Sequence, residues 1–506
     1  MVDTNSKRIA KNTIILYIRM LFLMCISLYT SRVVLKTLGV EDYGVYNVVG
    51  GVVSMFTMIS GSLVAAISRY ITYELGKGTL ESLKIVFSSS VIIQIITAVI
   101  FIFIAETVGL WFLNNYIVIP EGRDLVANWV YQLSIITFAI NLISVPFNAT
   151  IIAHENMNVF AYISILEGVG KLVIAWFIVI SPFDRLLFYA ILLTILAVTI
   201  RIIYGIYCNK KYAECRGKLI YDSSVLKQIF GFAGWNIIGA SSAVCRDQGG
   251  NILLNMFFGP TANAARGVAM QVSAAIQGFV ANFQMALNPQ ITKNYAIGNR
   301  EYMHELVFKG ARFSFYILWI ISLPVLIDVD YILSIWLVDV PNHSNNFLSI
   351  IIVFSLIESL SGPLMTSMYA TGIIRNYQIV VGGLQLLNLP LSYISLKAGM
   401  LPESVFFISV IVSFICLLAR LFMLKPLTGL VPIRFIIDVI LRVLLVSIVS
   451  FIPAYFVNHW IFRESILSFI ISVIVVLLVT SIIVLYMGCN KNERFFIISK
   501  IKIKHY

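Results

Sequence analysis

SILSFIISVIVVLLVTSIIVLYM, residues 465 to 487, decides the solvent in which this chain folds. The stretch contains no charged residue, and it is long enough to cross the hydrocarbon core of a bilayer, which takes roughly 20 apolar residues in an α-helix. Similar apolar windows recur along the whole sequence, separated by short polar breaks, and they predict fourteen membrane-spanning helices. The predicted spans lie near residues 12–34, 43–67, 84–106, 126–151, 157–181, 186–208, 228–256, 262–288, 306–327, 346–371, 377–397, 403–424, 433–457 and 465–487.

The composition excludes an ordinary soluble protein. Of the 506 residues, 59% are hydrophobic and only 12% are charged, and the mean hydropathy is +0.93. Soluble proteins are about half apolar and about a quarter charged. A single water-surrounded core also stops growing beyond roughly 250 to 300 residues, so it cannot bury this much apolar surface. We therefore predict an all-α polytopic membrane protein.

The positive charges predict the topology. With the N-terminus inside, 24 lysines and arginines fall in inner segments and 7 in outer ones, and Arg312 and Arg420 are counted among the inner ones. Because cytoplasmic loops carry the excess of positive charge, both termini are expected in the cytoplasm. The net charge of +12 then lies next to anionic lipid headgroups, which argues against a nucleic-acid partner. The six cysteines have no CxxC spacing, so neither a disulfide framework nor a metal site is indicated.

The chain also carries an internal repeat in its helix-breaking residues. Gly39 corresponds to Gly259 at a shift of about 220 residues, and Pro146 corresponds to Pro363 at a slightly shorter shift. An even number of helices in each repeat gives both lobes the same orientation, related by a pseudo-two-fold axis along the membrane normal. We predict an N-lobe at residues 1–215, a C-lobe at 216–426, and, at 427–506, helices 13 and 14 with a basic cytoplasmic tail on the membrane surface.

Polar side chains form a stripe along the eighth predicted span. They recur at steps of 7, 4, 7 and 4 residues, so they share one helical face: Arg266, Ser273, Gln277, Gln284 and Asn288. Lipid cannot satisfy these groups, so the stripe must face another helix or water. Two alternatives stay open, namely hydrogen bonds that hold the helices together and the lining of a water-filled cavity.

Charged residues inside spans need a reason, since each costs about 2.5 to 3.5 kcal/mol on insertion scales. Arg19 either extends to the inner interface or faces a polar interior. Arg246 and Asp247 point about 100° apart on a helix, so they need not pair with each other, and either could pair with another helix. The following Gly249-Gly250 has low helix propensity and predicts an interruption of the seventh span, where backbone groups could face a cavity.

Three further charges are candidates for ion coupling. Glu167 and Lys171 are four residues apart, a spacing at which they neutralise each other on one helix face. Glu358 has no cation three or four residues away, so it is either a proton site or a neutral buried acid. None of the five histidines has a second one at metal-ligand spacing, and no nucleotide or cofactor motif is present.

Two sequence blocks resemble bacterial lipid-linked oligosaccharide flippases of the Wzx type. The first block matches helices one and two, and the second matches helices seven and eight. The matching segments are TSRVVL (30–35), LGVEDYG (38–44), YNVVGG (46–51), RDQG (246–249), NILLN (251–255), FFGP (257–260), NAARG (263–267) and NPQIT (288–292). The resemblance extends over the whole chain in the number and order of spans.

The resemblance implies the fold of the multidrug/oligosaccharidyl-lipid/polysaccharide exporters, with two six-helix lobes around a cavity that opens alternately to either side. It implies as cargo an oligosaccharide on undecaprenyl pyrophosphate, moved from the inner to the outer leaflet of the bacterial cytoplasmic membrane for O-antigen (lipopolysaccharide) or capsule assembly. The family's cationic cavity residues correspond here to Arg19, Arg246 and Arg266, with Arg32 near the outer mouth.

We therefore expect a transporter rather than an enzyme, in which the three arginines hold the lipid pyrophosphate. Gln277, Gln284 and Asn288 are expected to meet sugar hydroxyls, while Asp247 and Glu358 are candidates for ion coupling. Besides this substrate, the expected partners are membrane lipids and proteins of polysaccharide polymerisation and assembly, with no cofactor. The alternatives are a drug or metabolite antiporter, a membrane glycan polymerase and a scaffold that transports nothing.

Overall fold

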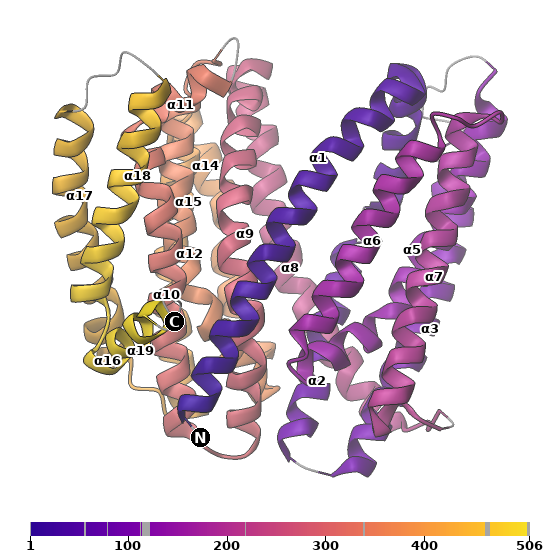
Figure 1. The fold of residues 1–506 in the computed structure, drawn as a ribbon, viewed down its shortest axis with the longest axis horizontal. Helices are drawn as coiled ribbons and strands as arrows, with labels where there is room; N and C mark the ends of the chain where they lie inside the picture. The colour runs from indigo at the N-terminus through magenta and orange to yellow at the C-terminus, as the bar shows by residue number, and fades with distance from the viewer. Residues whose placement is uncertain are drawn as a thin grey trace. The chain divides into compact units, whose positions relative to one another are not determined.

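The computed structural model describes residues 2–54, 57–77, 79–111, 113, 122–217, 219–336, 340–460 and 466–502. These residues form helices joined by short turns, and no strand occurs among them (Figure 1). The chain divides into two compact units. Unit 1 comprises Met1–Ile237 and Tyr295–Ile297, and unit 2 comprises Ile238–Asn294 and Gly298–Tyr506. The prediction of an all-α membrane protein is confirmed.

Unit 1 is built around α5, which packs against α1, α2, α3, α6 and α7. Its helices in chain order are α1 (Val2–Ser54), α2 (Thr57–Lys77), α3 (Leu80–Ile104), η1 (Ala105–Gly109), α5 (Asp124–Ala153), α6 (Met157–Phe177), α7 (Arg185–Lys211), η2 (Ala213–Cys215) and the first half of α8 (Ser223–Phe258). A core of fully buried Leu113, Val130 and Tyr131 joins these helices, and the Tyr131 hydroxyl donates to the carbonyl of Ala105 at 2.8 Å.

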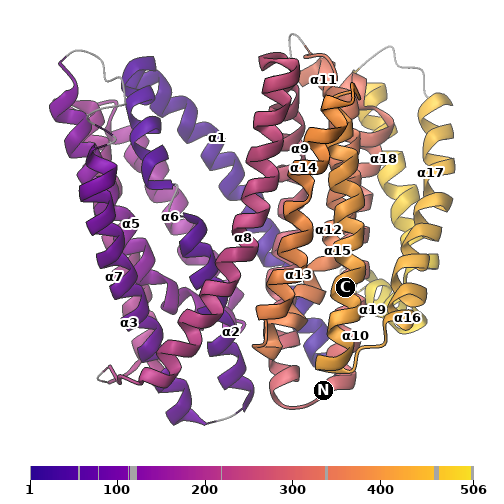
Figure 2. The same ribbon diagram turned by 180° about the vertical axis from the view of Figure 1, so that it is seen from behind.

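Unit 2 contains the rest of α8 and most of α9 (Pro260–Ala296). Its other helices are α10 (Arg300–Ile327), α11 (Val329–Trp336), α12 (Ser344–Thr371), α13 (Arg375–Leu386), α14 (Asn388–Lys397), α15 (Ser404–Thr428), α16 (Pro432–Phe435), η3 (Ile436–Leu441), α17 (Arg442–Trp460), α18 (Ile466–Ile483), η4 (Val484–Gly488) and α19 (Lys491–Lys502). The centre of the unit is α12, which packs against α10 and α15, and α13 and α14 lie along α15 (Figure 2).

Each of the fourteen predicted spans falls on helix within the described ranges. Eleven of the described helices are long and apolar enough to cross a membrane. The helices α8 and α9 are not among these eleven, although they have 36 and 37 residues. Their lower hydropathy follows from the polar residues that the sequence places on them. The two longest helices after α1 therefore carry Arg246, Asp247 and Arg266 and the predicted polar stripe.

The predicted repeat appears in the backbone of both units. Gly39 has φ +80° and interrupts α1, while Gly259 has φ +76° and separates α8 from α9. Glycine adopts this left-handed conformation without the steric cost of a Cβ, so both positions break a helix in the same way. Pro146 lies inside α5 and Pro363 inside α12, as their alignment predicts. The lobe boundaries at residues 215 and 426 stay predictions.

An equivalent polar contact joins two helix starts in each unit. In unit 1, Arg123 at the start of α5 pairs with Asp184 at the start of α7. In unit 2, His343 at the start of α12 lies with Nδ1 2.7 Å from Oε1 of Glu403 at the start of α15. Both residues of the second pair follow those of the first by about 220 residues. The repeat therefore extends to side chains that differ in chemical type.

Replacing Glu403 by glutamine is expected to lower the stability of the protein near neutral pH. Burial would raise the pKa of Glu403, but hydrogen bonds from Asn346 and His343 outweigh it, so the pKa lies below its usual value. A lowered pKa contributes stability above the unfolded-state pKa, and this stability is lost as the pH falls through the folded-state pKa. We expect a loss of about 1 to 2 kcal/mol at neutral pH that shrinks on acidification.

Thermal unfolding of the detergent-solubilised protein from neutral to acidic pH checks this expectation. Glu305→Gln is the matched control, because Glu305 is about half exposed and pairs with Lys309 on the same helix. Such exposed pairs contribute only about 0.3 to 0.5 kcal/mol. Parallel pH profiles for Glu403→Gln and the wild type would refute the assigned role of this carboxylate.

The C-terminal helix α19 is attached to unit 2 through a buried ion pair. Arg312 of α10 lies 2.7 Å from Glu493 of α19, and their side chains are only 5% and 9% exposed. The sequence count placed Arg312 in an inner segment between spans, but the structure places it in the middle of α10 with a buried side chain. The start of the basic tail is therefore fixed by protein contacts, and Lys504 lies outside the described residues.

Candidate functional site

Two arginines meet in unit 2 because α8 and α9 are joined by one tight turn. Gly259 makes the turn, and Pro260 opens α9, where a missing N–H costs no hydrogen bond. Arg246 and Asp247 lie on α8 before the turn, and Arg266 lies on α9 after it. The Nη2 of Arg266 donates to the backbone carbonyl of Asp247 at 2.8 Å. The sequence predicts both arginines as site residues, and the structure brings them together.

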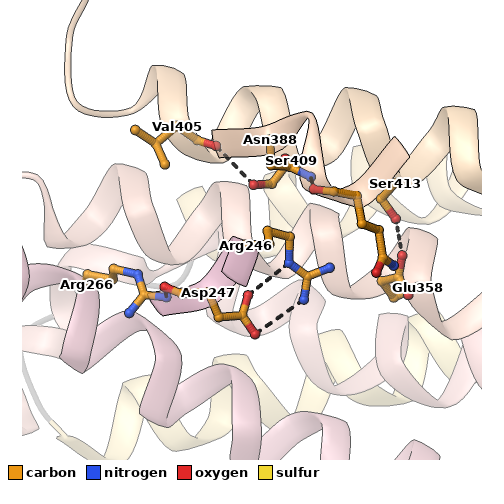
Figure 3. Close-up of polar contacts among 9 residues, drawn as sticks. Arg246, Asp247, Arg266, Glu358, Asn388, Val405, Ser409 and Ser413 are labelled. Atoms are coloured by element: carbon orange, nitrogen blue, oxygen red, sulfur yellow. Dashed lines mark hydrogen bonds and ion pairs between the residues drawn. The ribbon is translucent and has the colours of Figure 1, made fainter. Parts of the chain in front are cut away.

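Arg246 and Asp247 pair with each other despite being neighbours on one helix. The Nε of Arg246 donates to Oδ1 of Asp247 at 2.9 Å, and Nη2 donates to Oδ2 at 3.3 Å (Figure 3). The guanidinium also lies 4.9 Å from the centre of the Phe354 ring, a distance typical of a cation–π contact. Successive residues on a helix point about 100° apart, but the arginine side chain is long enough to bend toward its neighbour. The two side chains can therefore meet.

These residues line a cavity of about 140 Å³ inside unit 2. Its lining residues come from α8, α9, α12 and α15, and they are Arg246, Asp247, Gly250, Arg266, Met270, Ser273, Gln277, Ile351, Phe354, Val405, Phe406 and Ser409. A cavity that holds one water molecule needs a volume of about 10 to 15 Å³, so this cavity has room for a phosphate group together with water. Two cations and one carboxylate lie among largely apolar walls.

The polar stripe of α9 faces other helices, and part of it also lines the cavity. Ser273 and Gln277 line the cavity and also bond to α12, since Nε2 of Gln277 donates to Oγ of Ser355 at 2.7 Å. Further along α9, Gln284 donates to the carbonyl of Ser359 at 3.2 Å, and Asn288 accepts from Thr366 at 3.0 Å. Gln284 and Asn288 therefore serve helix packing, outside the cavity lining.

The helix α8 continues through Gly249-Gly250, so the predicted interruption is wrong. A Cβ on Gly249 would lie 2.7 Å from the side chain of Leu389, whereas Gly250 lines the cavity. The first glycine lets α14 approach α8 closely, and the hydrogen bonds of a long helix offset the low propensity of two residues. Gly250 thus forms part of the cavity wall within an unbroken helix, and Gly249 sets the spacing between α8 and α14.

Glu358 has a cationic partner that the sequence spacing did not reveal. Its Oε1 lies 3.9 Å from Nη1 of Arg420, and Ser413 donates to the same oxygen. Arg420 is 2% exposed and also donates to Ser361 at 2.8 Å and to Tyr377 at 3.3 Å. The prediction that Arg420 belongs to a cytoplasmic loop is wrong, because the residue lies inside α15. Glu358 is therefore part of an ion pair with a buried arginine, and its partner Ser413 lies four residues after the cavity residue Ser409 on α15 (Figure 3).

Arg19 lies on α1 in unit 1. Its guanidinium lies 4.6 Å from the Phe160 ring of α6, and Nε and Nη1 are buried without a hydrogen-bond partner among the described residues. An arginine that extends to the interface would hydrate these donors. Buried donors without acceptors are costly, so Arg19 is a candidate to bind an anion.

The remaining charged residues of unit 1 that the sequence singled out are exposed. Lys171 donates to Oε1 of Glu167 at 2.7 Å, and both side chains are exposed. The sequence leaves two roles open for these residues, ion coupling and mutual neutralisation. The observed contact is that of mutual neutralisation. Arg32 is exposed on α1, ahead of the break at Gly39.

Sequence reasoning missed the apolar and hydroxyl walls of the cavity, and it missed Arg420. Phe354, Met270 and Phe406 look like any other apolar residues of a span. Arg420 shares a helical face with Ser409 and Ser413, a spacing of 4 and 7 residues that does signal a polar stripe on α15. Among the residues that the structure describes, no group of three or more His, Cys, Asp and Glu could hold a metal ion.

Sequence comparisons relate the chain to known families. A model described as "Polysaccharide biosynthesis protein" matches residues 9–295, more than half of the chain. A second model, described as MatE, matches residues 250–394, which include the whole of α9 and of α12. No curated protein matches the sequence significantly.

Solved structures of MATE transporters have the same fold. A MATE crystal structure in the straight conformation is similar with a TM-score of 0.73 at 14% identity, over 84% of this chain and 97% of that one. A MOP superfamily transporter from Pyrococcus furiosus, described as having a binding pocket of reverse polarity, is similar with a TM-score of 0.69 at 14% identity, over 84% and 96% of the two chains. At these identities the similarity shows the fold alone.

Proposed function

The chain belongs to the polysaccharide biosynthesis protein family, a membrane-transporter family of the MOP superfamily, and on that premise we propose that it flips undecaprenyl-pyrophosphate-linked oligosaccharide. The lipid-linked sugar moves from the inner to the outer leaflet of the bacterial cytoplasmic membrane by alternating access. The product serves assembly of a surface polysaccharide, either O-antigen or capsule. Both termini lie in the cytoplasm.

The observation that carries this proposal is the pair of arginines in one cavity of unit 2. Arg246 and Arg266 are joined through Asp247, and the cavity has room for a phosphate group. Guanidinium groups bind phosphate oxygens through paired N–H donors and stay protonated at any physiological pH. A cavity with two guanidinium groups favours an anionic cargo, whereas a transporter for cationic drugs needs an excess of acidic groups.

The sugar and the lipid tail require surfaces beyond this cavity. Ser273 and Gln277 offer hydroxyl and amide groups beside the arginines and suit sugar hydroxyls. The buried guanidinium of Arg19 in unit 1 offers a second anion contact, and Arg32 is exposed on the same helix. The polyprenyl tail is expected to stay in the lipid.

Ion coupling is assigned to the acidic residues of unit 2. Glu358 is 26% exposed and pairs with the buried Arg420, so a proton on its carboxylate would weaken an ion pair that joins α12 to α15. Asp247 neutralises Arg246 directly. The exposed Glu167 and Lys171 pair already neutralises itself and is assigned no coupling role. Partner proteins are those that polymerise and assemble the glycan on the outer surface.

Transfer between leaflets in proteoliposomes tests the function. Purified protein is reconstituted with fluorescent undecaprenyl-pyrophosphate oligosaccharide, and the fraction accessible to an impermeant reagent is followed over time. Protein-dependent transfer of this lipid, with no uptake of a cationic dye, supports a flippase. Dye uptake without lipid transfer would support the antiporter, and neither activity in folded protein would support a scaffold.

A further inference from the structure

We propose that Asp247 is a built-in counter-anion that occupies Arg246 until the phosphate of the cargo replaces it. The inference rests on the proposed function, since it concerns the same cavity and a phosphate-bearing ligand. It adds a role in release, because a cavity that binds phosphate too tightly cannot deliver its cargo. The carboxylate thereby sets the affinity of the site for phosphate.

The geometry of the pair is that of a bound oxyanion. A carboxylate and a phosphate both offer two oxygens to two N–H donors of one guanidinium. Asp247 takes the Nε and Nη2 donors of Arg246 at 2.9 and 3.3 Å. Its carboxylate thus fills one of the edges of the guanidinium that a phosphate would use. The guanidinium also lies against the Phe354 ring, which restricts its rotation away from Asp247.

The exposed fractions of the two side chains show which one an incoming ligand meets first. The Arg246 side chain is 14% exposed, whereas the Asp247 side chain is 42% exposed. The carboxylate is therefore the accessible member of the pair and the guanidinium the covered one. A ligand anion can reach these donors of Arg246 only by displacing or crowding the carboxylate.

Asp247 also contacts the second arginine of the cavity. Its backbone carbonyl accepts from Nη2 of Arg266 at 2.8 Å, so this one residue lies between both guanidinium groups (Figure 3). The cavity holds two positive charges and one negative charge among its lining residues. Phosphate therefore meets a net charge of plus one, and removal of the carboxylate would leave both cations facing the phosphate.

The contact with Arg266 uses the backbone, so it survives substitution of the side chain. Asp247→Asn keeps the size of the side chain and the carbonyl bond to Arg266, but it removes the competing charge. An amide can donate to phosphate instead of repelling it. The substitution thus separates competition for Arg246 from the structural role of residue 247.

The test measures binding of inorganic pyrophosphate and of undecaprenyl pyrophosphate to the full chain in nanodiscs of zwitterionic lipid. Asp247→Asn is expected to bind both ligands about fivefold more tightly or better, since a partly exposed charge pair must no longer be broken. Turnover at saturating lipid substrate is expected to fall, because release becomes slower. A higher affinity for the lipid alone would locate the effect at the lipid-bound headgroup. A higher affinity for both ligands would locate it at the phosphate itself.

Two controls isolate the mechanism. The double variant Arg246→Ala with Asp247→Asn is expected to show no gain in affinity over Arg246→Ala, because the carboxylate acts through Arg246. Asp438→Asn breaks an exposed pair with Arg434, four residues earlier on the same helix, and is expected to leave binding unchanged. It matches the chemistry of the first substitution at residues that do not line the cavity.

The outcomes separate this inference from the proposed function. Wild-type affinity or weaker binding in Asp247→Asn, with normal pyrophosphate binding by the wild type, overturns the inference and leaves the flippase proposal standing. Weaker binding would mean that the carboxylate positions Arg246 instead of competing for it. If the folded wild type and Asp247→Asn both bind no pyrophosphate, both proposals fail.

Discussion

Replacing Arg246 by alanine is expected to reduce leaflet transfer of lipid-linked oligosaccharide about 10- to 100-fold, with expression and membrane insertion unchanged. Each hydrogen bond from a charged donor to the phosphate is worth about 1.5 to 3 kcal/mol, and Arg246 supplies the donors that its pair with Asp247 already orients. Arg246→Lys is expected to fall between the wild type and alanine, since an ammonium keeps the charge but loses the paired donors.

The proteoliposome assay measures this effect. Arg434→Ala is the control, because Arg434 is 74% exposed and pairs only with Asp438 on its own helix among the described residues. Loss of activity in both variants would indicate a general effect of surface charge. Full transfer by Arg246→Ala, at normal protein level, would remove Arg246 from the mechanism.

Replacing Arg420 by methionine is expected to destabilise the protein by about 3 kcal/mol. Methionine is apolar and of similar length, so it removes the cation while filling most of the space. Glu358, Ser361 and Tyr377 would then lose a partner inside the helix bundle. Breaking a buried ion pair by removing one member costs about 3 to 5 kcal/mol, and the partial exposure of Glu358 places this one at the lower end.

A double variant tests whether the cost comes from the charge left behind. Glu358→Gln combined with Arg420→Met is expected to recover about 1 to 2 kcal/mol relative to Arg420→Met alone, because no unpaired carboxylate remains. Thermal and denaturant unfolding in detergent measure the stabilities. Equal stabilities of wild type and Arg420→Met would show that the buried network contributes nothing to folding.

The apolar spans and the main cations of the site could be predicted from the sequence, because both depend on local pattern. Arg246 and Arg266 stand out in the sequence as charged residues inside predicted spans, where contact with lipid is unfavourable. The turn at Gly259 explains why the two meet. Gln277 follows from the 4- and 7-residue steps of one helical face. These inferences need only the geometry of a single helix and the solvent around it.

Contacts between distant helices could not be predicted in this way. Arg420 lies near the end of a span, where the edge between helix and loop is uncertain by a few residues, and its partner Glu358 is on another helix. The walls of the cavity at Phe354 and Phe406 are apolar like the rest of their spans. The roles of Gln284 and Asn288 likewise depend on which carbonyl or hydroxyl group the neighbouring helix presents.

The most direct test of the central claim is the position of the pyrophosphate in a structure of the full chain bound to undecaprenyl pyrophosphate. The account predicts phosphate oxygens within hydrogen-bonding distance of Arg246 and Arg266, with the Asp247 carboxylate moved off Arg246. Density for the headgroup away from this cavity, with the Arg246–Asp247 pair intact, would contradict it.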